Sequence, residues 1–276
     1  MLTSHTKPLI MGILNVTPDS FSDGGRFNTL TAALKHTEQM LADGADIIDI
    51  GGESTRPYSL SVSSGEQIHR VIPVIKAIRA QISDRIPISI DTRLSAVARL
   101  ALAEGANIIN DVSAGQDDPE LLALAAQTRC PMVLMHRQGN ALTMQQQPFY
   151  SDVVGEVLDS LQASVARAVA AGIDRQQLII DPGIGFGKRL ADDLGLLQHL
   201  PRFVATGIPV LLGTSRKQCL RSVTGSEQEA DLAVSTAATT ALAVMAGVSI
   251  VRVHDVKANR QALEIAWAIR QHSSNA

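Results

Sequence analysis

The sequence predicts an α/β protein that folds as a closed (β/α)8 barrel, also called a TIM barrel. Eight short apolar runs recur along its 276 residues, each followed by a polar loop and a helical pattern. The runs are almost continuously apolar, as expected of parallel strands covered on both faces. A doubly wound sheet is the alternative. We favour the barrel because the count is eight and no G-x-G-x-x-G follows the first run to mark a dinucleotide-binding fold.

The predicted strands alternate with amphipathic segments, which are the predicted helices. In the first segment, Leu30, Leu34 and Leu41 fall at helical spacing, and Gly44 suits a C-terminal stop. In chain order, the predicted strands are Leu9–Leu14, Asp46–Ile50, Pro87–Asp91, Asn107–Asp111, Met132–His136, Leu178–Asp181, Pro209–Gly213 and Ser249–His254.

A repeated pattern supports successive βα units. The segments LADGADIIDI, from Leu41, and LAEGANIIND, from Leu102, follow the same scheme. In each, a helix ends, a glycine turns the chain, and an apolar strand finishes on a polar residue. The segment MAGVSIVRVHD, from Met245, repeats this scheme more loosely.

We expect a single domain over residues 1–276. Length alone permits two domains, but α/β barrels commonly reach this size as one, and no Pro/Gly/Ser-rich linker divides the chain. The polar loops at about 15–28 and 51–66 are expected to be mobile and to close over a substrate, and residues from about 271 to 276 are expected to form a tail.

The composition limits the classes of function. The chain is 45% hydrophobic and 18% charged, which is typical of globular proteins. Its net charge is -3 and it has no long basic tract, so neither nucleic acid nor a membrane is expected as a partner. Two cysteines without metal-ligand spacing, and no run of roughly 20 apolar residues, indicate a cytoplasmic protein.

Polar residues stand where the predicted strands end, which is where barrels carry their active sites. Asp91, Asn110 and Asp181 offer hydrogen-bond acceptors and one amide, which suit the amino-amide edge of a flat heterocycle. These groups could instead pair with one another across the barrel mouth. Because so many strand ends are polar, and burying each group without a partner costs several kcal/mol, we favour a ligand site.

A second group of strand-end residues is cationic. Lys217, Arg252 and His254 suit a phosphate, and Arg252 could also stack on a ring. For His136, which ends a predicted strand, a structural hydrogen bond is favoured over a ligand role. Arg216 is expected to face solvent.

Taken together, the motifs at the strand ends resemble those of the dihydropteroate synthases. The matching segments occur in order along nearly the whole chain, and the first two, the sixth and the last are together highly specific. They are NVTPDSFSDGG (15–25), GGESTRP (51–57), IDT (90–92), INDVSAG (109–115), LMHRQG (134–139), DPGIGFGK (181–188), SRK (215–217) and RVHDV (252–256).

The resemblance implies that the chain joins (7,8-dihydropterin-6-yl)methyl diphosphate to 4-aminobenzoate with Mg2+, giving the folate precursor 7,8-dihydropteroate. It implies sulfonamides as competitive inhibitors, and a homodimer. The pterin pocket would comprise Asp91, Asn110, Asp181 and Lys217, with Arg252 packed against the pterin.

The resemblance also assigns the other two regions of the site. Asn15 would meet Mg2+ and the diphosphate, helped on the metal side by Asp23 and Asp19. Near the phosphates it places Thr55, Arg252 and His254. On the 4-aminobenzoate and sulfonamide side it places Phe21, Arg56, Pro57, Phe186 and Ser215. The residues expected to carry catalysis are Asp91, Asp181, Lys217, Arg252 and His254.

Two positions depart from the family pattern, and rival functions remain open. Tyr58 stands where the family usually has Gly, and Arg137 where Met is common. The rivals are a methyltetrahydrofolate methyltransferase-like barrel, a non-catalytic pterin-binding homologue and an unrelated sugar-phosphate barrel. Retention of Asn15 and Lys217 argues against a non-catalytic homologue.

The expected chemistry is substitution at a methylene carbon next to an electron-rich ring. Such a carbon can release diphosphate early, because the dihydropterin stabilises the resulting cation. Mg2+, Asn15, His254 and Arg252 would stabilise the leaving group. Asp91 and Asp181 would favour the positive charge that develops on the pterin.

Overall fold

The computed structural model describes residues 6–17, 26–54 and 58–274, and strands alternate with helices along these ranges. The strands are β1 (Leu9–Asn15), β2 (Ile47–Gly51), β3 (Ile88–Asp91), β4 (Ile108–Asp111), β5 (Met132–Met135), β6 (Leu178–Asp181), β7 (Leu211–Leu212) and β8 (Ile250–Val253). The helices are α1 (Arg26–Ala42), α2 (Ser64–Gln81), α3 (Ser95–Ala103), α4 (Glu120–Thr128), α5 (Val153–Ala170), the 3-10 turn η2 (Arg175–Gln177), α6 (Leu190–Gln198), α7 (Leu200–Val204), α8 (Gln218–Thr224), α9 (Glu229–Ala246) and α10 (Val256–Ser274).

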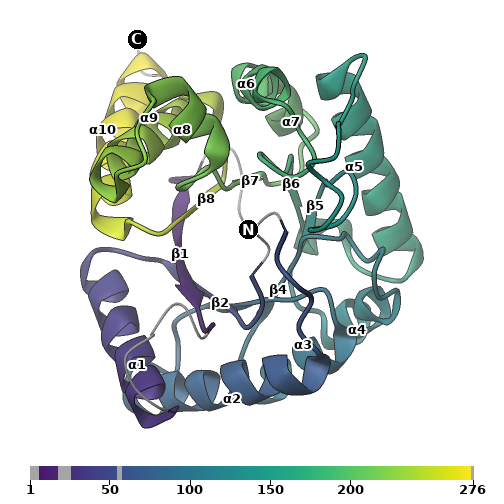
Figure 1. Cartoon of the computed structure of the whole chain (residues 1–276), viewed down its shortest axis with the longest axis vertical. Coiled ribbons are helices and arrows are strands. Elements are labelled where there is room, and N and C mark those ends of the chain that lie inside the picture. Colours follow the sequence, from purple (N-terminus) through teal and green to yellow (C-terminus); the bar gives the residue numbers. More distant parts are fainter. Residues whose placement is uncertain (1–5, 18–25, 55–57, 275–276) are drawn as a thin grey trace.

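The strands form a ring that the helices surround (Figure 1). All neighbouring strands are parallel, in the order β6-β5-β4-β3-β2-β1-β8-β7. Between the two edge strands, Ile180 forms a parallel bridge to Val210, and its amide donates to the carbonyl of Pro209 at 2.9 Å. This contact nearly closes the ring, so the predicted (β/α)8 barrel is confirmed.

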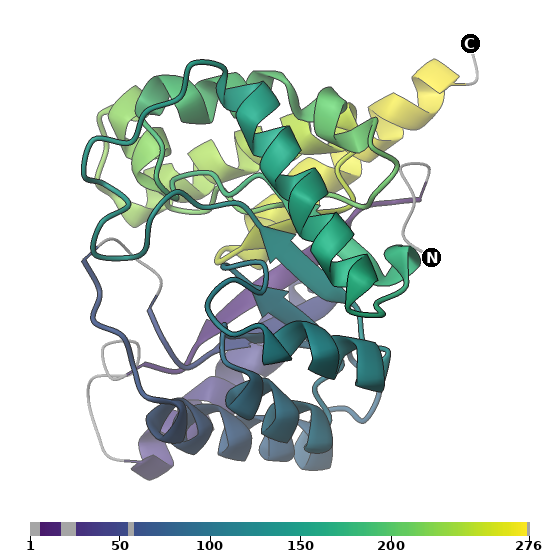
Figure 2. The ribbon, with the colours of Figure 1, turned by 90° about the vertical axis from the view of Figure 1, so that its right-hand side faces the viewer.

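Each predicted strand is present, with its ends shifted by at most two residues. The largest shift is at β7, which is only two residues long. At the end of the chain, α10 continues through Ser274, so the first part of the tail expected from about residue 271 is helical. Figure 2 shows the strands running between helices at the top and bottom of the view. None of the helices in the described ranges is long and apolar enough to cross a bilayer.

The core of the barrel has two parts. A large apolar cluster fills the space between the strands and the helices. A smaller cluster lies apart from it and takes one inward-facing side chain from each of seven strands: Met11, Ile47, Ile108, Val133, Ile179, Leu211 and Ile250. We call this smaller cluster the barrel floor. On β3, Ser89 lies beside the floor residue Ile108 of β4, and its buried hydroxyl has no hydrogen-bond partner in the described part of the chain.

The repeated turn seen in the sequence is a shared capping device. Gly44 and Gly105 follow α1 and α3 in left-handed conformations, with φ of +99° and +108°, which glycine adopts at little cost. In both turns one guanidinium donates two hydrogen bonds to the glycine carbonyl, from Arg260 to Gly44 and from Arg79 to Gly105. Both turns precede strands, so these contacts lie at the end of the barrel opposite the predicted site.

Candidate active site

A polar layer lies directly beyond the barrel floor, toward the C-terminal ends of the strands. Side chains two positions apart on a strand face the same side, so the residue two positions after a floor residue also points into the barrel. On five strands this residue is polar. These residues, which we call the polar layer, are Asp49 on β2, Asp91 on β3, Asn110 on β4, Asp181 on β6 and Arg252 on β8.

Arg252 joins the layer across the barrel. Its Nε donates to the carboxylate of Asp49 at 2.7 Å, and one terminal nitrogen donates to that of Asp91 at 2.6 Å. The amide nitrogen of Asn110 lies 3.3 Å from the nearer oxygen of Asp49. The structure thus brings Asp91, Asn110 and Arg252 together as predicted, and it realises part of the cross-barrel pairing that the sequence left open.

Burial dominates the electrostatics of this layer. It raises the pKa of Asp91 to about 7, although Arg252 opposes the shift. Burial also raises the pKa of Asp181, against the effect of Lys217, and it lowers the pKa of Lys217, against the effect of Asp181. Keeping each of these groups charged costs desolvation free energy, and a ligand with matching donors and acceptors would offset this cost.

Lys217 reaches the layer from the loop after β7. Its ammonium donates to the carbonyl of Ile184 and lies 4.7 Å from the ring centroid of Phe186, within the range of a cation–π contact. Both partners belong to the loop after β6. Lys217 therefore contacts the DPGIGFGK segment, which begins at Asp181, another residue of the predicted pterin pocket.

Ser215 and His254 form a second polar contact at the barrel mouth. The Ser215 hydroxyl lies 2.9 Å from Nδ1 of His254 and accepts a bond from the His254 backbone amide at 3.1 Å. If the hydroxyl donates to Nδ1, the imidazole proton sits on Nε2, where it can donate to an anion. Arg216 follows Ser215 in the chain and pairs with Asp255, which follows His254, at 2.9 Å. It therefore does not simply face solvent as expected.

The expected metal side of the site is only partly described. Asn15 ends β1, and an added Cβ on Gly51 would lie 3.8 Å from its side-chain oxygen and 3.7 Å from Oδ2 of Asp91. The missing side chain leaves room between these two groups. In the described ranges no cluster of three or more His, Cys, Asp or Glu could hold a metal. The predicted site residues that lie outside the described ranges are Asp19, Phe21, Asp23, Thr55, Arg56 and Pro57.

Sequence reasoning missed Asp49, which is fully buried at the centre of the Arg252 network. The signal was a charged residue inside the apolar run of β2, but the run was interpreted as a strand whose polar end follows it. Glu53 was also missed. Its carboxylate accepts bonds from the Val62 amide at 2.8 Å and from Arg93 at 3.1 Å, so it ties the loop after β2 to the loop after β3.

Arg137, one of the two departures from the family pattern, belongs to the rim of the barrel mouth. It pairs with Asp117, which also pairs with Arg93 at 2.9 Å. Tyr58, the other departure, has a positive φ of 65°, which suits the glycine usual in the family, and its amide donates to the carbonyl of Ala141 at 2.8 Å. Arg137 thus links the loops after β3, β4 and β5, and Tyr58 links the loops after β2 and β5.

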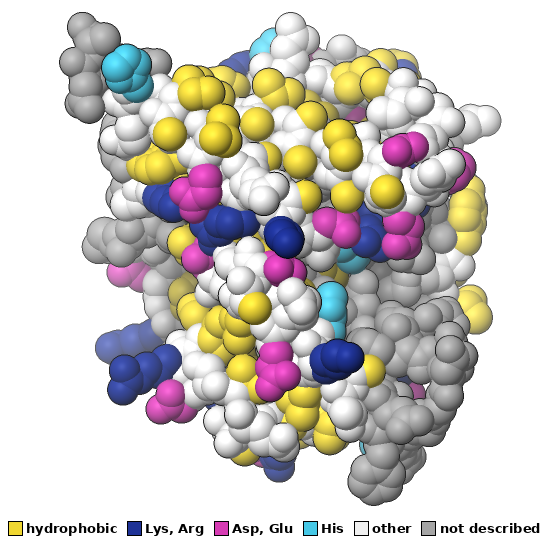
Figure 3. Space-filling view, turned by 90° about the vertical axis from the view of Figure 1, so that its left-hand side faces the viewer, with side chains coloured by type: hydrophobic (Ala, Val, Ile, Leu, Met, Phe, Trp, Pro, Cys, Tyr) yellow, Lys and Arg dark blue, Asp and Glu magenta, His cyan; other side chains and the backbone are white. Residues whose placement is uncertain are grey.

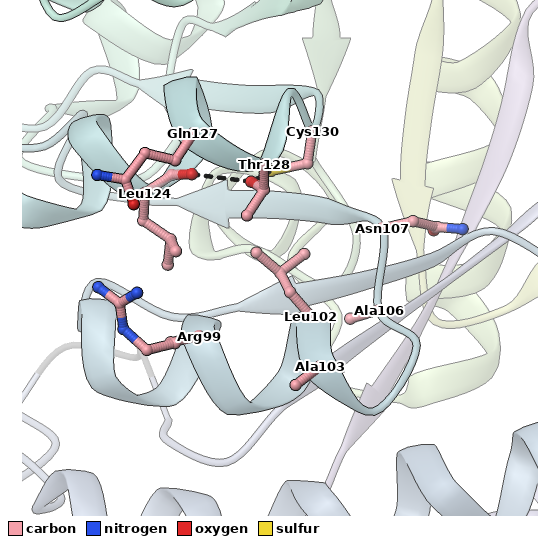
Figure 4. Close-up of a pocket in the computed structure, with 9 residues that line it drawn as sticks. All are labelled: Arg99, Leu102, Ala103, Ala106, Asn107, Leu124, Gln127, Thr128 and Cys130. Atoms are coloured by element: carbon pink, nitrogen blue, oxygen red, sulfur yellow. Dashed lines mark hydrogen bonds between the residues drawn. The ribbon is translucent and has the colours of Figure 1, made fainter.

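A groove of about 400 Å³ lies on the outside of the barrel between α3 and α4 (Figure 4). Leu102 and Leu124 line it, together with Asn107, which immediately precedes β4, and Cys130, which lies two residues before β5. The groove therefore lies at the N-terminal ends of these strands. It is remote from the polar layer and includes none of its side chains.

Comparisons with known proteins agree on one family. The model of the family described as pterin binding enzyme matches residues 11–254. A dihydropteroate synthase of Synechocystis is 45% identical over 95% of this chain and 90% of its own. A structure of the Xanthomonas albilineans dihydropteroate synthase with 4-aminobenzoic acid is 45% identical, with a TM-score of 0.89 over 96% of this chain and 93% of its own. A Yersinia pestis dihydropteroate synthase with a sulfonamide drug is 42% identical, with a TM-score of 0.89 over 96% and 95%.

Proposed function

Because the chain belongs to the pterin binding enzyme family, we propose that its polar layer is the pterin site of a dihydropteroate synthase. The activity is the condensation of (7,8-dihydropterin-6-yl)methyl diphosphate with 4-aminobenzoate, which gives 7,8-dihydropteroate and diphosphate in folate biosynthesis. The observation that carries the site assignment is the set of four buried polar side chains, joined by the partly buried Arg252, directly above an otherwise apolar barrel floor.

The pterin part of the site consists of Asp91, Asn110 and Asp181. An ionised carboxylate accepts two parallel N–H bonds, which matches the amino-amide edge of a pterin, and the Asn110 amide can both donate and accept. Arg252 lies beside them and is held by Asp49 and Asp91. We assign Lys217 to the same pocket, where the Ile184 carbonyl in the loop after β6 accepts a hydrogen bond from its ammonium.

The diphosphate part of the site consists of Asn15 and His254 among the described residues. With the tautomer favoured by Ser215, Nε2 of His254 donates a hydrogen bond to a phosphate oxygen. Thr55 and Asp23, outside the described ranges, are assigned here from the family pattern. A single amide ligand fits a Mg2+ ion that is bound mainly by substrate phosphates, which is how this ion usually binds in proteins. When bound, the ion would neutralise negative charge on the leaving diphosphate.

The 4-aminobenzoate part of the site consists of Phe186 and Ser215 among the described residues. We add Phe21, Arg56 and Pro57 from the family pattern. We assign sulfonamides, as competitive inhibitors, to this same part of the site; a Yersinia pestis dihydropteroate synthase has been solved as a complex with a sulfonamide drug. Phe186 offers an aromatic face next to Lys217.

The chemistry follows from this arrangement. The bond between the methylene carbon and the diphosphate oxygen breaks, and a bond to the amine nitrogen forms as that nitrogen loses a proton. Asp91 and Asp181 stabilise positive charge that develops on the dihydropterin ring, and His254 stabilises the departing oxygen. Arg252 favours the ionised form of Asp91, because its positive charge lowers the Asp91 pKa against the effect of burial.

We also propose a homodimer formed through α9 and α10. These helices pack together and expose large apolar side chains, with Val234 71% exposed and Ile265 65% exposed. Figure 3 faces the side of the molecule that carries them and shows hydrophobic side chains gathered across its upper part. A second copy would cover this face, as isologous dimers do. Leu242→Glu should yield a monomer in sedimentation velocity, whereas Val169→Glu, on exposed α5, should not.

The reaction is tested by following diphosphate release from dihydropterin-methyl diphosphate. Release should depend on both 4-aminobenzoate and Mg2+, and a sulfonamide should inhibit it. Pterin binding without turnover would favour a non-catalytic homologue instead. Absence of pterin binding would overturn the assignment of Asp91, Asn110 and Asp181.

We place the protein in the cytoplasm, where its two free thiols, Cys130 and Cys219, would stay reduced.

A further inference from the structure

The loop after β6, residues 182–189, is packed tightly against the loop after β5. Gly183 and Gly187 have positive φ values of 68° and 65°. An added Cβ on Gly183 would lie 1.9 Å from the carbonyl oxygen of His136, and one on Gly187 would lie 2.2 Å from that of Gln138. The two loops therefore meet backbone to backbone.

A buried ammonium fastens this loop from within. Lys188 is only 4% exposed, and its Nζ reaches three acceptors. It donates to the carbonyl of Gly183 at 2.8 Å and to that of Phe186 at 3.1 Å, and it lies 3.0 Å from Nδ1 of His136. These contacts occupy all three donors of an ammonium group. Lys188 thus has no donor left for a substrate.

His136 receives this ammonium and joins it to the sheet. Burial, together with the Lys188 charge, lowers the pKa of His136 to about 3, so the ring is neutral. Since Nδ1 faces a cation, it acts as the acceptor, and the ring proton lies on Nε2. The backbone amide of His136 donates to the Asp181 carbonyl at 2.9 Å, which fixes the ring relative to β6. The structural hydrogen bond expected for His136 is therefore present.

The loop held in this way presents two groups to the proposed active site. The carbonyl of Ile184 accepts from the Lys217 ammonium, and the ring of Phe186 lies beside the same ammonium. A shift of the loop would move both groups together. The pterin contacts of Asp91 and Asn110 belong to β3 and β4 and would stay in place.

We propose that Lys188 and His136 are positioning residues that set the 4-aminobenzoate part of the site through Phe186. This inference rests on the synthase function proposed above. Neither residue touches substrate. Their loss should weaken the use of 4-aminobenzoate more than the use of the pterin substrate.

The test compares His136→Leu with His136→Asn in steady-state kinetics. Leucine removes the acceptor, whereas the Asn side-chain oxygen stands near the position of Nδ1. We expect His136→Leu to raise KM for 4-aminobenzoate about tenfold while KM for the pterin diphosphate changes less than about twofold. His136→Asn should restore both KM values to within about twofold of wild type.

Two further variants complete the experiment. Lys188→Met removes the ammonium but keeps the length of the chain, and it should show the same KM split. Lys76→Met, which removes an exposed lysine of α2 paired with Glu104, should leave both KM values unchanged. If Lys188→Met does not fold, the comparison of the two His136 variants decides.

Equal rises in both KM values, unchanged KM values in folded His136→Leu, or failure of Asn to rescue would each overturn the inference. Wild-type turnover is the reference. If the wild type makes no dihydropteroate, the proposed function itself fails, and that outcome is distinct from any result with the variants.

Discussion

Replacing Asp49 with Asn should disrupt the centre of the polar layer. The carboxylate of Asp49 is fully buried, and it accepts from Nε of Arg252 and from the amide of Asn110. An amide supplies one oxygen in place of two, and its NH2 group would face one of these donors. The substitution removes the charge that compensates Arg252 on this side and leaves Arg252 paired with Asp91 alone.

The magnitude follows from burial. Removing one partner of a buried ion pair costs about 3–5 kcal/mol. Asp91 remains to share the Arg252 charge, so we expect the free energy of unfolding to fall by about 3 kcal/mol in urea titrations. Because the Asp49 charge raises the pKa of Asp91, that pKa should fall below about 7 in the variant. The kcat/KM for the pterin substrate should drop about 30-fold, or about 2 kcal/mol of transition-state stabilisation, as Arg252 shifts toward Asp91.

Glu104→Gln is the matched control. Glu104 pairs with Lys76 at 3.1 Å on the surface, and such pairs contribute about 0–1 kcal/mol. If Asp49→Asn loses no more stability than this control and keeps wild-type kinetics, then Asp49 does not organise Arg252. A rise in the Asp91 pKa, seen in the pH dependence of pterin binding, would contradict the electrostatic account.

Four other outcomes follow from the structure. Burial raises the folded pKa of Asp91 to about 7 from about 3.9 unfolded, so its contribution to stability is present at low pH and lost as pH rises through 7. Asp91 should therefore contribute a fall of about 1 kcal/mol per pH unit to the free energy of unfolding between pH 5 and 7, and Asp91→Asn should remove that part of the slope in urea titrations. Lys217→Met should lower kcat/KM at least about 100-fold, with a smaller change in unfolding free energy because the lysine is desolvated. Gly183→Ala should cost about 3 kcal/mol by displacing the His136 carbonyl, whereas Gly207→Ala, at a similar φ in open space, should cost about 1 kcal/mol. Arg260→Ala should destabilise the fold by about 2 kcal/mol, from its lost carbonyl contacts, and leave turnover unchanged.

The fold was predictable because each barrel strand is buried on both faces and reads as a continuous apolar run. The rule that function lies at strand ends selected Asp91, Asn110 and Asp181, which the structure places together in the polar layer. It could not locate partners that depend on loop contacts. Nothing local in the sequence indicates that Lys188 folds back onto His136, 52 residues away in the chain. Nor does it indicate that Arg216, inside a motif, pairs with Asp255.

Asp49 shows what a strand-end rule lacks and what would supply it. The rule selects the last residue of a run, but the direction of a side chain depends on whether its position is odd or even along the strand. Ile47, Ile108, Ile179 and Ile250 all face inward at the barrel floor, and the residue two positions after each is polar. Applied to β2, this two-residue step from Ile47 selects Asp49; Gly51, the strand's last residue, faces the same way but has no side chain. The polar layer is therefore encoded as a pattern of period two within the apolar runs, and only the contacts of Arg252 and Asn110 across the barrel show that its members meet.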